Sequence, residues 1–237
     1  VLQRIGEDQQ KVLADPNTAN AWTQLTMEEA GAILVAGEQG ISRADFRRYS
    51  ASRDMKVEFP GARGFGFIRR VPLADEAAFV ARARQDDAPG FAIRQLQPHA
   101  GERYVIQYFE PQAGNQQAIG LDIASEANRK AAADATMRSG QVQLTAPITL
   151  VQAMKAPSKS FLMLMPIYRD GMARDSEAQR VAATLGWSYA PILMNEVMGA
   201  IRINPELTQF TLSDVSDPRK PVVFYASRAA AGAVIGS

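Results

Sequence analysis

ERYVIQYFEPQAGNQQAIGLDIASEANRKAAADATMRSGQVQLTAPITL, residues 102–150, is the stretch around which the rest of the chain can be arranged. Residues 104–110 are rich in aromatic and β-branched side chains, which favour a strand. Residues 111–117 are turn-forming, and residues 119–122 return to an extended pattern. A helix and another short strand are expected to follow. This order predicts an α+β unit.

The helix of this stretch is expected to begin at Ser125, whose hydroxyl can accept from the unpaired amides of the first turn, and to end at Gly140. Ala127, Ala131 and Ala135 recur every four residues, so its inward face is expected to consist of methyl groups. Such a helix can lie very close to a sheet. Any cavity is then expected between the sheet and the flanking loops.

The first strand offers candidate pocket residues. Tyr104, Ile106 and Tyr108 alternate along it and are expected to share one face of the sheet. Side chains in this arrangement either line a pocket or form ordinary core, and the strand alone leaves both readings open.

The composition is that of an ordinary globular protein. In its 237 residues, 26 basic and 25 acidic side chains leave a formal charge of +1, so no global field attracts nucleic acid. The absence of cysteine excludes disulfides and thiolate chemistry and permits any compartment. No apolar run approaches the roughly 20 residues of a membrane helix. Any flanking membrane helices are therefore expected outside this sequence.

The residues before the first strand follow a helical pattern up to about Met55. Ser42-Arg-Ala-Asp45 resembles a capping box that opens a helix through Phe46 and Tyr49. Residues 1–58 are therefore expected to form a helical stalk. The stalk either pairs with a second copy of itself, giving a homodimer, or packs on the chain's own core.

The later part of the chain repeats the order of strands and helices. Residues 161–168 are almost wholly apolar, which is typical of a strand buried on both faces. A polar loop is expected up to Arg180, a strand over residues 181–189, and a helix beginning at Pro191. Residues 207–215 and 222–225 predict a hairpin. With a boundary near residues 156–160, two similar lobes are expected.

Catalytic and metal-binding interpretations find little support in the residues. His99 is the single histidine and lies in a turn-like Gln-Pro-His-Ala-Gly segment, so it is expected to be a surface loop residue. Gly64 and Gly66 lack the other elements of a phosphate-binding loop and are better explained by close packing within a strand. No metal, cofactor or catalytic residue is expected.

A carboxylate site for a hard cation is the remaining metal hypothesis. It would use Glu110, Asp122 and Glu126, but their spacing follows no calcium-loop pattern. Helix-capping and surface roles are expected for these three side chains instead.

Several blocks of the chain, in order, resemble the CHASE domain family. They are Gly64-Phe-Gly-Phe-Ile-Arg-Arg-Val-Pro72, Tyr104-Val-Ile-Gln-Tyr108, Glu110-Pro111, Gly120-Leu-Asp122, Ser125-Glu-Ala-Asn-Arg-Lys130, Leu144-Thr-Ala-Pro-Ile148 and Met165-Pro-Ile-Tyr168. Weaker similarity to plant cytokinin receptors continues through residues 181–187 and 214–218. The resemblance spans about residues 59–168.

The resemblance implies an extracytoplasmic sensory domain of a bacterial transmembrane receptor, located in the periplasm. It implies a long N-terminal helical stalk followed by two PAS-like lobes with antiparallel sheets. Residues 59–158 would be the membrane-distal, ligand-binding lobe, and residues 159–237 the membrane-proximal lobe. Membrane helices would flank the domain, and the parent's output would be a histidine kinase or a diguanylate cyclase or phosphodiesterase. The segment itself would not be an enzyme.

The resemblance also carries candidate ligand residues. Arg129 stands where cytokinin receptors have the aspartate that holds the adenine ring, and Leu164 replaces a polar threonine. Thr145 matches a receptor threonine, and Val151 takes the place of a leucine whose backbone contacts the ligand. Because a guanidinium only donates hydrogen bonds, a cytokinin is not expected.

Arg129 suits a different ligand, a small anionic molecule with a carboxylate or phosphate. The alternative is that Arg129 pairs with Glu126 or Asp122 on the surface. At the level of function, the alternative to a small-molecule sensor is a periplasmic protein-interaction module that detects a partner protein.

Overall fold

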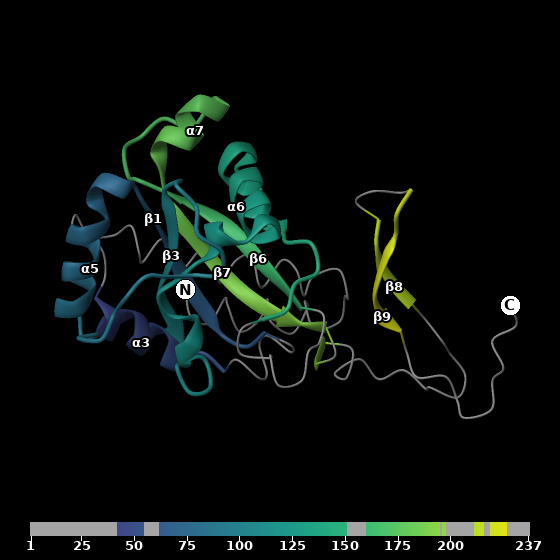
Figure 1. Ribbon diagram of the computed structural model, residues 1–237, viewed down its shortest axis with the longest axis horizontal. Coiled ribbons are helices and arrows are strands. Elements are labelled where there is room, and N and C mark those ends of the chain that lie inside the picture. The colour runs from purple at the N-terminus through teal and green to yellow at the C-terminus, as the bar shows by residue number, and fades with distance from the viewer. Residues whose placement is uncertain are drawn as a thin grey trace, which may run out of the picture.

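The computed structural model describes residues 42–54, 62–150, 160–194, 196–197, 211–215 and 219–226. The architecture is α+β, as predicted, with a large sheet and helices on both of its faces (Figure 1). The strands are β1 (Phe65–Val71), β2 (Arg94–Gln95), β3 (Arg103–Glu110), β4 (Leu121–Asp122), β5 (Gln143–Leu144), β6 (Ser160–Tyr168), β7 (Thr184–Leu193), β8 (Thr211–Asp214) and β9 (Val222–Ala226). The helices are α3 (Arg43–Ala51), α5 (Glu76–Gln85), α6 (Ala127–Ser139) and α7 (Glu177–Ala183), with short 3-10 turns η1 (Leu73–Asp75), η2 (Gln116–Ala118) and η3 (Ile123–Ser125).

Seven strands form the large sheet in the order β2-β4-β3-β1-β7-β6-β5. All neighbouring strands are antiparallel except the short β2–β4 pair. β6 is buried along nearly its whole length, as predicted from its apolar sequence. β6 and β7 follow the boundary expected near residues 156–160, yet they belong to the same sheet as β1 and β3. The large sheet therefore draws strands from both sides of that boundary.

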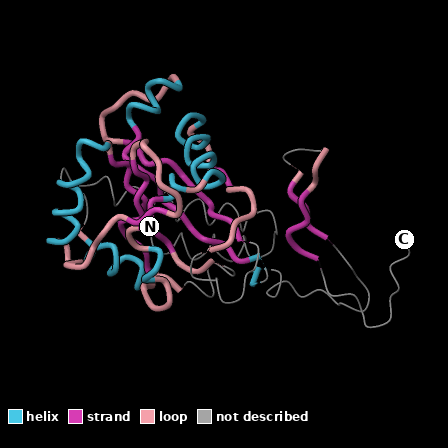
Figure 2. Tube along the Cα trace, viewed as in Figure 1, coloured by secondary structure: helices cyan, strands magenta, loops and turns pink. Residues whose placement is uncertain are grey.

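The two faces of the sheet carry different helices (Figures 1 and 2). α6 packs on one face over a core that includes Ile68, Leu164 and Trp187. α3 and α5 pack on the opposite face, where Phe46 and Phe79 belong to two further clusters. Of the expected stalk, residues 1–41 and 55–58 lie outside the described residues, and α3 is the part that is described.

α3 begins as its sequence predicts. The Ser42 hydroxyl accepts from the Asp45 amide, and the Asp45 carboxylate accepts from the Ser42 amide, which completes the capping box. The ring of Phe46 then stacks on Tyr108 at a centroid distance of 5.5 Å. This contact fixes α3 against the middle of β3.

A bulge in β3 changes which side chains share a face. Phe67 of β1 pairs with Tyr108, but the next residue of β1 pairs with Ile106, so Gln107 is the extra residue. Tyr104 and Ile106 consequently lie on the α6 face, whereas Tyr108 lies on the α3 face. The prediction that all three share one face is wrong, because strict alternation ends at the bulge.

α6 ends at Gly140, as predicted, in a left-handed conformation (φ 74°). Its first turn is capped by the carboxylate of Glu126, not by the predicted Ser125. Ser125 instead accepts a hydrogen bond from the Leu96 amide and donates to the Asp122 carbonyl. The cap is therefore one residue later than expected.

The rotation of α6 about its axis also differs from the prediction. Ala127, Ala131 and Ala135 are exposed, and the side chains that face the core are Arg129, Ala132, Ala133, Thr136 and Met137. Five of the 13 residues of α6 are alanines and they lie on several sides of the helix, so the spacing of their methyl groups does not determine the buried face. The close approach to the sheet does occur, since the indole nitrogen of Trp187 donates to the Ala133 carbonyl at 3.0 Å.

The residues around β7 correct two further predictions. The expected polar loop before this strand contains α7, opened by a capping box of Ser176 and Gln179. The expected helix start at Pro191 lies inside β7, opposite Leu162 of β6. Proline is tolerated at this position because its carbonyl still accepts from the Arg63 amide. The strand lacks only the N–H donor that proline does not have.

β8 and β9 form the predicted hairpin as a separate two-stranded antiparallel sheet. Phe224 of β9 contacts Phe161 of β6 edge to face at 4.9 Å. Within the part of the chain that the structure describes, no helix has the length and apolarity needed to cross a membrane.

Candidate ligand site

A small cavity lies on the α6 face of the large sheet. Its volume is about 20 Å³, enough for about one water molecule. Two polar side chains line it, those of Arg129 from α6 and Tyr189 from β7. The other lining residues are apolar and come from the sheet, from the segment between β3 and α6, and from the segment after β5. They are Ile106, Ala118, Leu121, Ile123, Leu150, Leu162 and Pro191.

Arg129 is held in the cavity wall through both its backbone amide and its guanidinium. Its amide donates to the capping carboxylate of Glu126 at 3.1 Å, and its Nη2 donates to the Thr149 carbonyl at 2.9 Å. The nearest ion pair, with Glu126, spans 3.9 Å. Only 3% of Arg129 is exposed. Burial lowers the pKa of its guanidinium, while Glu126 and Tyr189 act in the opposite direction.

Tyr189 reaches the cavity because Gly66 leaves room for its ring. The two residues are paired across β1 and β7, and a Cβ on Gly66 would lie 2.2 Å from the ring carbon Cε1. Phe109 packs on the other side of the ring at 5.5 Å. Gly66 therefore has the close-packing role that the sequence predicts for it.

The hydroxyl of Tyr189 is buried and has no hydrogen-bond partner within the described residues. Burial raises the pKa of Tyr189 well above 10, with only the Arg129 charge opposing the shift. The hydroxyl therefore keeps its proton and can donate. A buried, unsatisfied hydroxyl beside a buried guanidinium is unusual in a stable core, because each unmade hydrogen bond costs about 1–3 kcal/mol.

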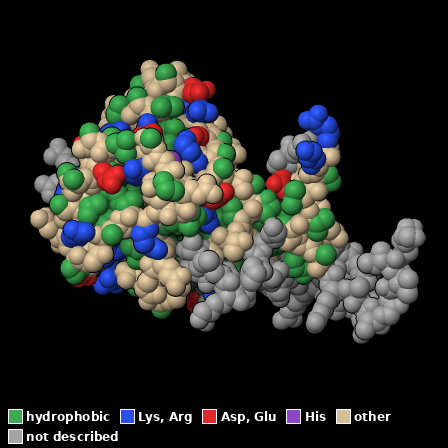
Figure 3. Space-filling view, in the orientation of Figure 1, with side chains coloured by type: hydrophobic (Ala, Val, Ile, Leu, Met, Phe, Trp, Pro, Cys, Tyr) green, Lys and Arg blue, Asp and Glu red, His purple; other side chains and the backbone are tan. Residues whose placement is uncertain are grey.

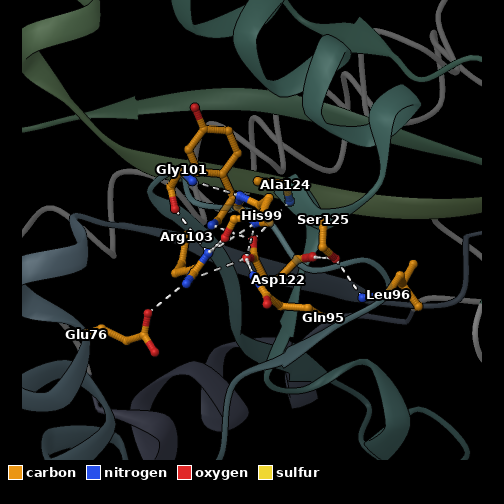
Figure 4. A network of polar contacts seen from close by, with 10 residues as sticks. Glu76, Gln95, Leu96, His99, Gly101, Arg103, Asp122, Ala124 and Ser125 are labelled. Carbon is orange, nitrogen blue, oxygen red and sulfur yellow. Dashed lines mark hydrogen bonds and ion pairs between the residues drawn. The ribbon is translucent and has the colours of Figure 1, made fainter.

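Asp122 fixes the segment that forms one side of the cavity (Figure 4). This carboxylate is completely buried and accepts from the amides of Tyr104 at 2.9 Å and Ala124 at 3.0 Å. Its other oxygen lies 2.7 Å from Nε2 of His99. Because Ile123 follows directly, this network holds a lining residue in place.

His99 is part of this network and not the simple surface residue that was expected. Its Nδ1 accepts from the Gly101 amide at 3.2 Å, so the proton of the neutral ring is on Nε2, which donates to Asp122. Arg103 donates to the His99 carbonyl and pairs with Glu76, which extends the network to α5 (Figure 4). The arrangement holds a loop.

The three carboxylates considered for a cation site are separate from one another. Asp122 and Glu126 cap η3 and α6, as expected, and Glu110 accepts from the amide and side chain of Gln112. Among the described residues, no group of three or more His, Cys, Asp or Glu side chains is arranged to hold a metal ion.

The structure brings together two of the seven residues selected from the sequence. Ile106 and Arg129 line the cavity. Thr145 and Leu164 are buried elsewhere on the same side: Oγ1 of Thr145 accepts from the Leu162 amide at 3.0 Å and so completes the pairing beside β6. Val151 lies outside the described residues.

The two tyrosines selected from β3 do not line the cavity. Tyr104 packs on Trp187 at 4.4 Å and donates to Asp134 at 2.8 Å. Tyr108 lies on the opposite face of the sheet. The sequence reasoning missed Tyr189, and the available signal was Gly66, whose missing side chain indicates that a large group packs on that backbone.

A comparison with protein families finds that a family model described as CHASE domain matches residues 39–225. A comparison with curated proteins finds no match.

Proposed function

The chain belongs to the CHASE domain family, and from this premise we propose that it binds a small anionic molecule in the cavity between α6 and the large sheet. CHASE domains are extracytoplasmic, non-catalytic sensory domains of receptors. The proposed protein is a periplasmic sensor domain of a bacterial transmembrane receptor. In this proposal the PAS-like ligand-binding lobe, expected over residues 59–158, is the seven-stranded sheet with α6, and it also takes in β6 and β7 from beyond that range.

The observation that carries this proposal is the polarity of the cavity. Arg129 and the unpaired hydroxyl of Tyr189 face a space that is otherwise apolar. A core that existed only for stability would do better with apolar residues at both positions. The buried guanidinium has a 3.9 Å ion pair with Glu126 and a bond to the Thr149 carbonyl, and the Tyr189 hydroxyl has no partner among the described residues. An anionic ligand would supply a closer charged partner for Arg129 and the missing partner for Tyr189.

The small size of the cavity supports the proposal that ligand binding changes the conformation of the cavity wall. At about 20 Å³ it holds a water molecule but no larger ligand, so a ligand must move part of the wall. The wall between β3 and α6 consists of η2, β4 and η3, which are short elements. A ligand that binds the widened state shifts the population toward it, and this shift is the proposed signal.

The proposal extends to the parent protein. The signal would pass along the N-terminal residues 1–58, which we expect to pair in a homodimer, to a membrane helix and a cytoplasmic histidine kinase, diguanylate cyclase or phosphodiesterase. Fusing the chain with its own flanking segments to a reporter kinase tests this part. Output that is unaffected by deleting residues 59–168 would contradict a signalling role.

A thermal-shift screen of the 237-residue chain against a metabolite library tests ligand binding. At least one compound is expected to raise the melting temperature of the wild type. Arg129→Gln should abolish this shift. Arg138→Gln is the matched control, because Arg138 lies on the same helix with its side chain half exposed and away from the cavity. If no compound at high concentration stabilises the wild type, the chain is not a small-molecule sensor.

A second candidate function is recognition of a partner protein through the β8–β9 hairpin. Val215, Val222 and Val223 are exposed by 47–62% there. Basic side chains gather at the tip of this hairpin, whereas both signs are interspersed over the visible face of the main body (Figure 3). This function would be favoured if the double substitution Val222→Ser/Val223→Ser changes receptor output while Arg129→Gln leaves it unchanged.

A further inference from the structure

The hydrogen-bonding groups of the cavity limit the chemistry of its ligand. The guanidinium of Arg129 only donates hydrogen bonds. The hydroxyl of Tyr189 keeps its proton, because burial raises its pKa well above 10. No carboxylate is among the residues that line the cavity. The Tyr189 oxygen can also accept, but the charge of Arg129 in the same cavity disfavours an ammonium or other cation. The polar end of a ligand should therefore accept from both donors.

The number of donors separates a carboxylate from a phosphate. A carboxylate has two oxygens, which match one guanidinium and one hydroxyl. Inorganic phosphate and phosphate monoesters have at least three free oxygens and up to two negative charges. The remaining lining side chains are apolar, so a third oxygen and a second charge would be buried without partners. The site therefore fits a monoanion.

The remaining walls define the body of the ligand. Ile106, Leu121, Ile123, Leu150 and Leu162 surround the polar pair with branched aliphatic groups. Each methylene buried among them should tighten binding by about fourfold. The resting volume of about 20 Å³ favours a body of few atoms, since every further atom requires more displacement of packed side chains.

We propose that the ligand is a short-chain aliphatic monocarboxylate whose two oxygens accept from Arg129 and Tyr189 and whose hydrocarbon part packs against the aliphatic wall. This proposal rests on the proposed function, because it names the ligand class of the same cavity. Tyr189 is its specificity-determining residue. Arg129 alone would bind many anions, and the hydroxyl adds the requirement for a second oxygen at a defined position.

The test is isothermal titration of the 237-residue chain with sodium propionate, butyrate and isobutyrate. Butyramide and butylamine have nearly the same shape and supply the neutral and cationic comparisons, and inorganic phosphate supplies the dianionic one. At least one carboxylate should bind at millimolar concentration or below, at least tenfold more tightly than butyramide. Butylamine and phosphate should not bind.

The variants locate the binding within the cavity. Arg129→Gln should weaken carboxylate binding by about 10–100-fold, and Tyr189→Phe by about 5–10-fold, in line with the loss of a charged and a neutral hydrogen bond. Arg138→Gln should bind like the wild type. Arg129→Lys keeps the charge. If it binds carboxylate partially, the loss of binding in Arg129→Gln comes from the lost contact and not from misfolding. Circular dichroism confirms that each variant is folded.

The outcomes distinguish the ligand class from the proposed function. Equal binding of butyramide and butyrate, or tighter binding of phosphate, overturns the monocarboxylate proposal and leaves the sensor role standing. Carboxylate binding that Arg129→Gln and Tyr189→Phe do not change also overturns it. If the metabolite screen yields a ligand while every carboxylate fails, the class is wrong. If the screen yields none at all, the proposed function itself fails.

Discussion

Arg129 of α6 and Tyr189 of β7 line the same buried cavity, and each lowers the electrostatic cost of the other's charged form. Glu126 and Thr149 hold the guanidinium, whereas the hydroxyl has no partner within the described residues. This pairing joins the helix to the sheet at a polar point inside an apolar core. It gives the site its proposed chemistry and also predicts how stability depends on pH.

The stability of the protein should fall as the pH rises above about 10. Burial raises the pKa of Tyr189 and Tyr168 above the unfolded value of about 10, so the unfolded state releases protons that the folded state retains. The stabilising effect is complete below pH 10 and is lost above it. A tyrosine that stays protonated in the fold contributes a slope of about 1.4 kcal/mol per pH unit. Urea unfolding at several pH values measures the slope.

Tyr189→Phe isolates the contribution of one hydroxyl to this slope. The unfolding free energy of the variant should fall less steeply with pH above pH 10. At neutral pH the variant should be as stable as the wild type or up to about 1 kcal/mol more stable, because it lacks an unsatisfied buried group. A loss of more than about 1 kcal/mol at neutral pH would show that the hydroxyl already has a partner.

Asp122→Asn should destabilise the protein by about 3–5 kcal/mol, because an amide would direct N–H groups at donors that need an acceptor. His99→Gln should cost less, about 1–2 kcal/mol, since the His99 ring is partly exposed. Asp170→Asn is the control, because Asp170 is exposed and accepts only from the Gly171 amide. Chemical denaturation gives the three values. Equal effects at Asp122 and Asp170 would refute the network.

Trp187→Phe should loosen α6 from the sheet and destabilise the protein by about 2–4 kcal/mol. It removes the hydrogen bond to the Ala133 carbonyl and leaves a void at a fully buried position. Tyr104→Phe removes the hydroxyl's bonds to Asp134 at 2.8 Å and to Glu102 at 3.4 Å, both partly exposed carboxylates, and should cost about 1 kcal/mol. Urea midpoints at neutral pH rank the two variants, and the reverse order would contradict this role of Trp187.

Asp86→Asn should weaken the attachment of α3 to the sheet by about 1–2 kcal/mol. The Asp86 carboxylate accepts from the Arg43 amide at 3.0 Å and from the Tyr108 hydroxyl at 2.7 Å, which joins α3 to β3 at its bulge. Amide hydrogen exchange in residues 43–51 should become faster. Asp170→Asn is the control, because its side chain is exposed and bonds to the neighbouring Gly171 amide, away from α3. Unchanged exchange in Asp86→Asn would exclude this anchor.

Several elements could be predicted because their signals are local. The Ser42–Asp45 capping box, the left-handed Gly140 and the apolar run of β6 each depend on residues that are close in sequence. The placement of Arg129 beside a cavity was expected from family resemblance, and the structure shows it buried there, not on the surface. Its binding of a ligand stays a prediction.

Other features could not be predicted, because non-local packing determines them. The bulge at Gln107 arises from pairing with β1 and sends Tyr108 to the other face. The buried side of α6 is selected by its contact with Trp187, since alanines occur all around the helix. Pro191 remains in a strand because Leu162 and Arg63 pair beside it.

The sequence by itself determined the buried strand β6, the start of α3, the end of α6 and the family, since each depends on propensities, caps or ordered motifs within short segments. Only the tertiary structure decided that Tyr189 meets Arg129. Those two side chains come from elements far apart in the chain, and their meeting depends on strand register, on the space left by Gly66 and on the rotation of α6. These are properties of packing, in which a shift of one residue exchanges the two faces of a strand.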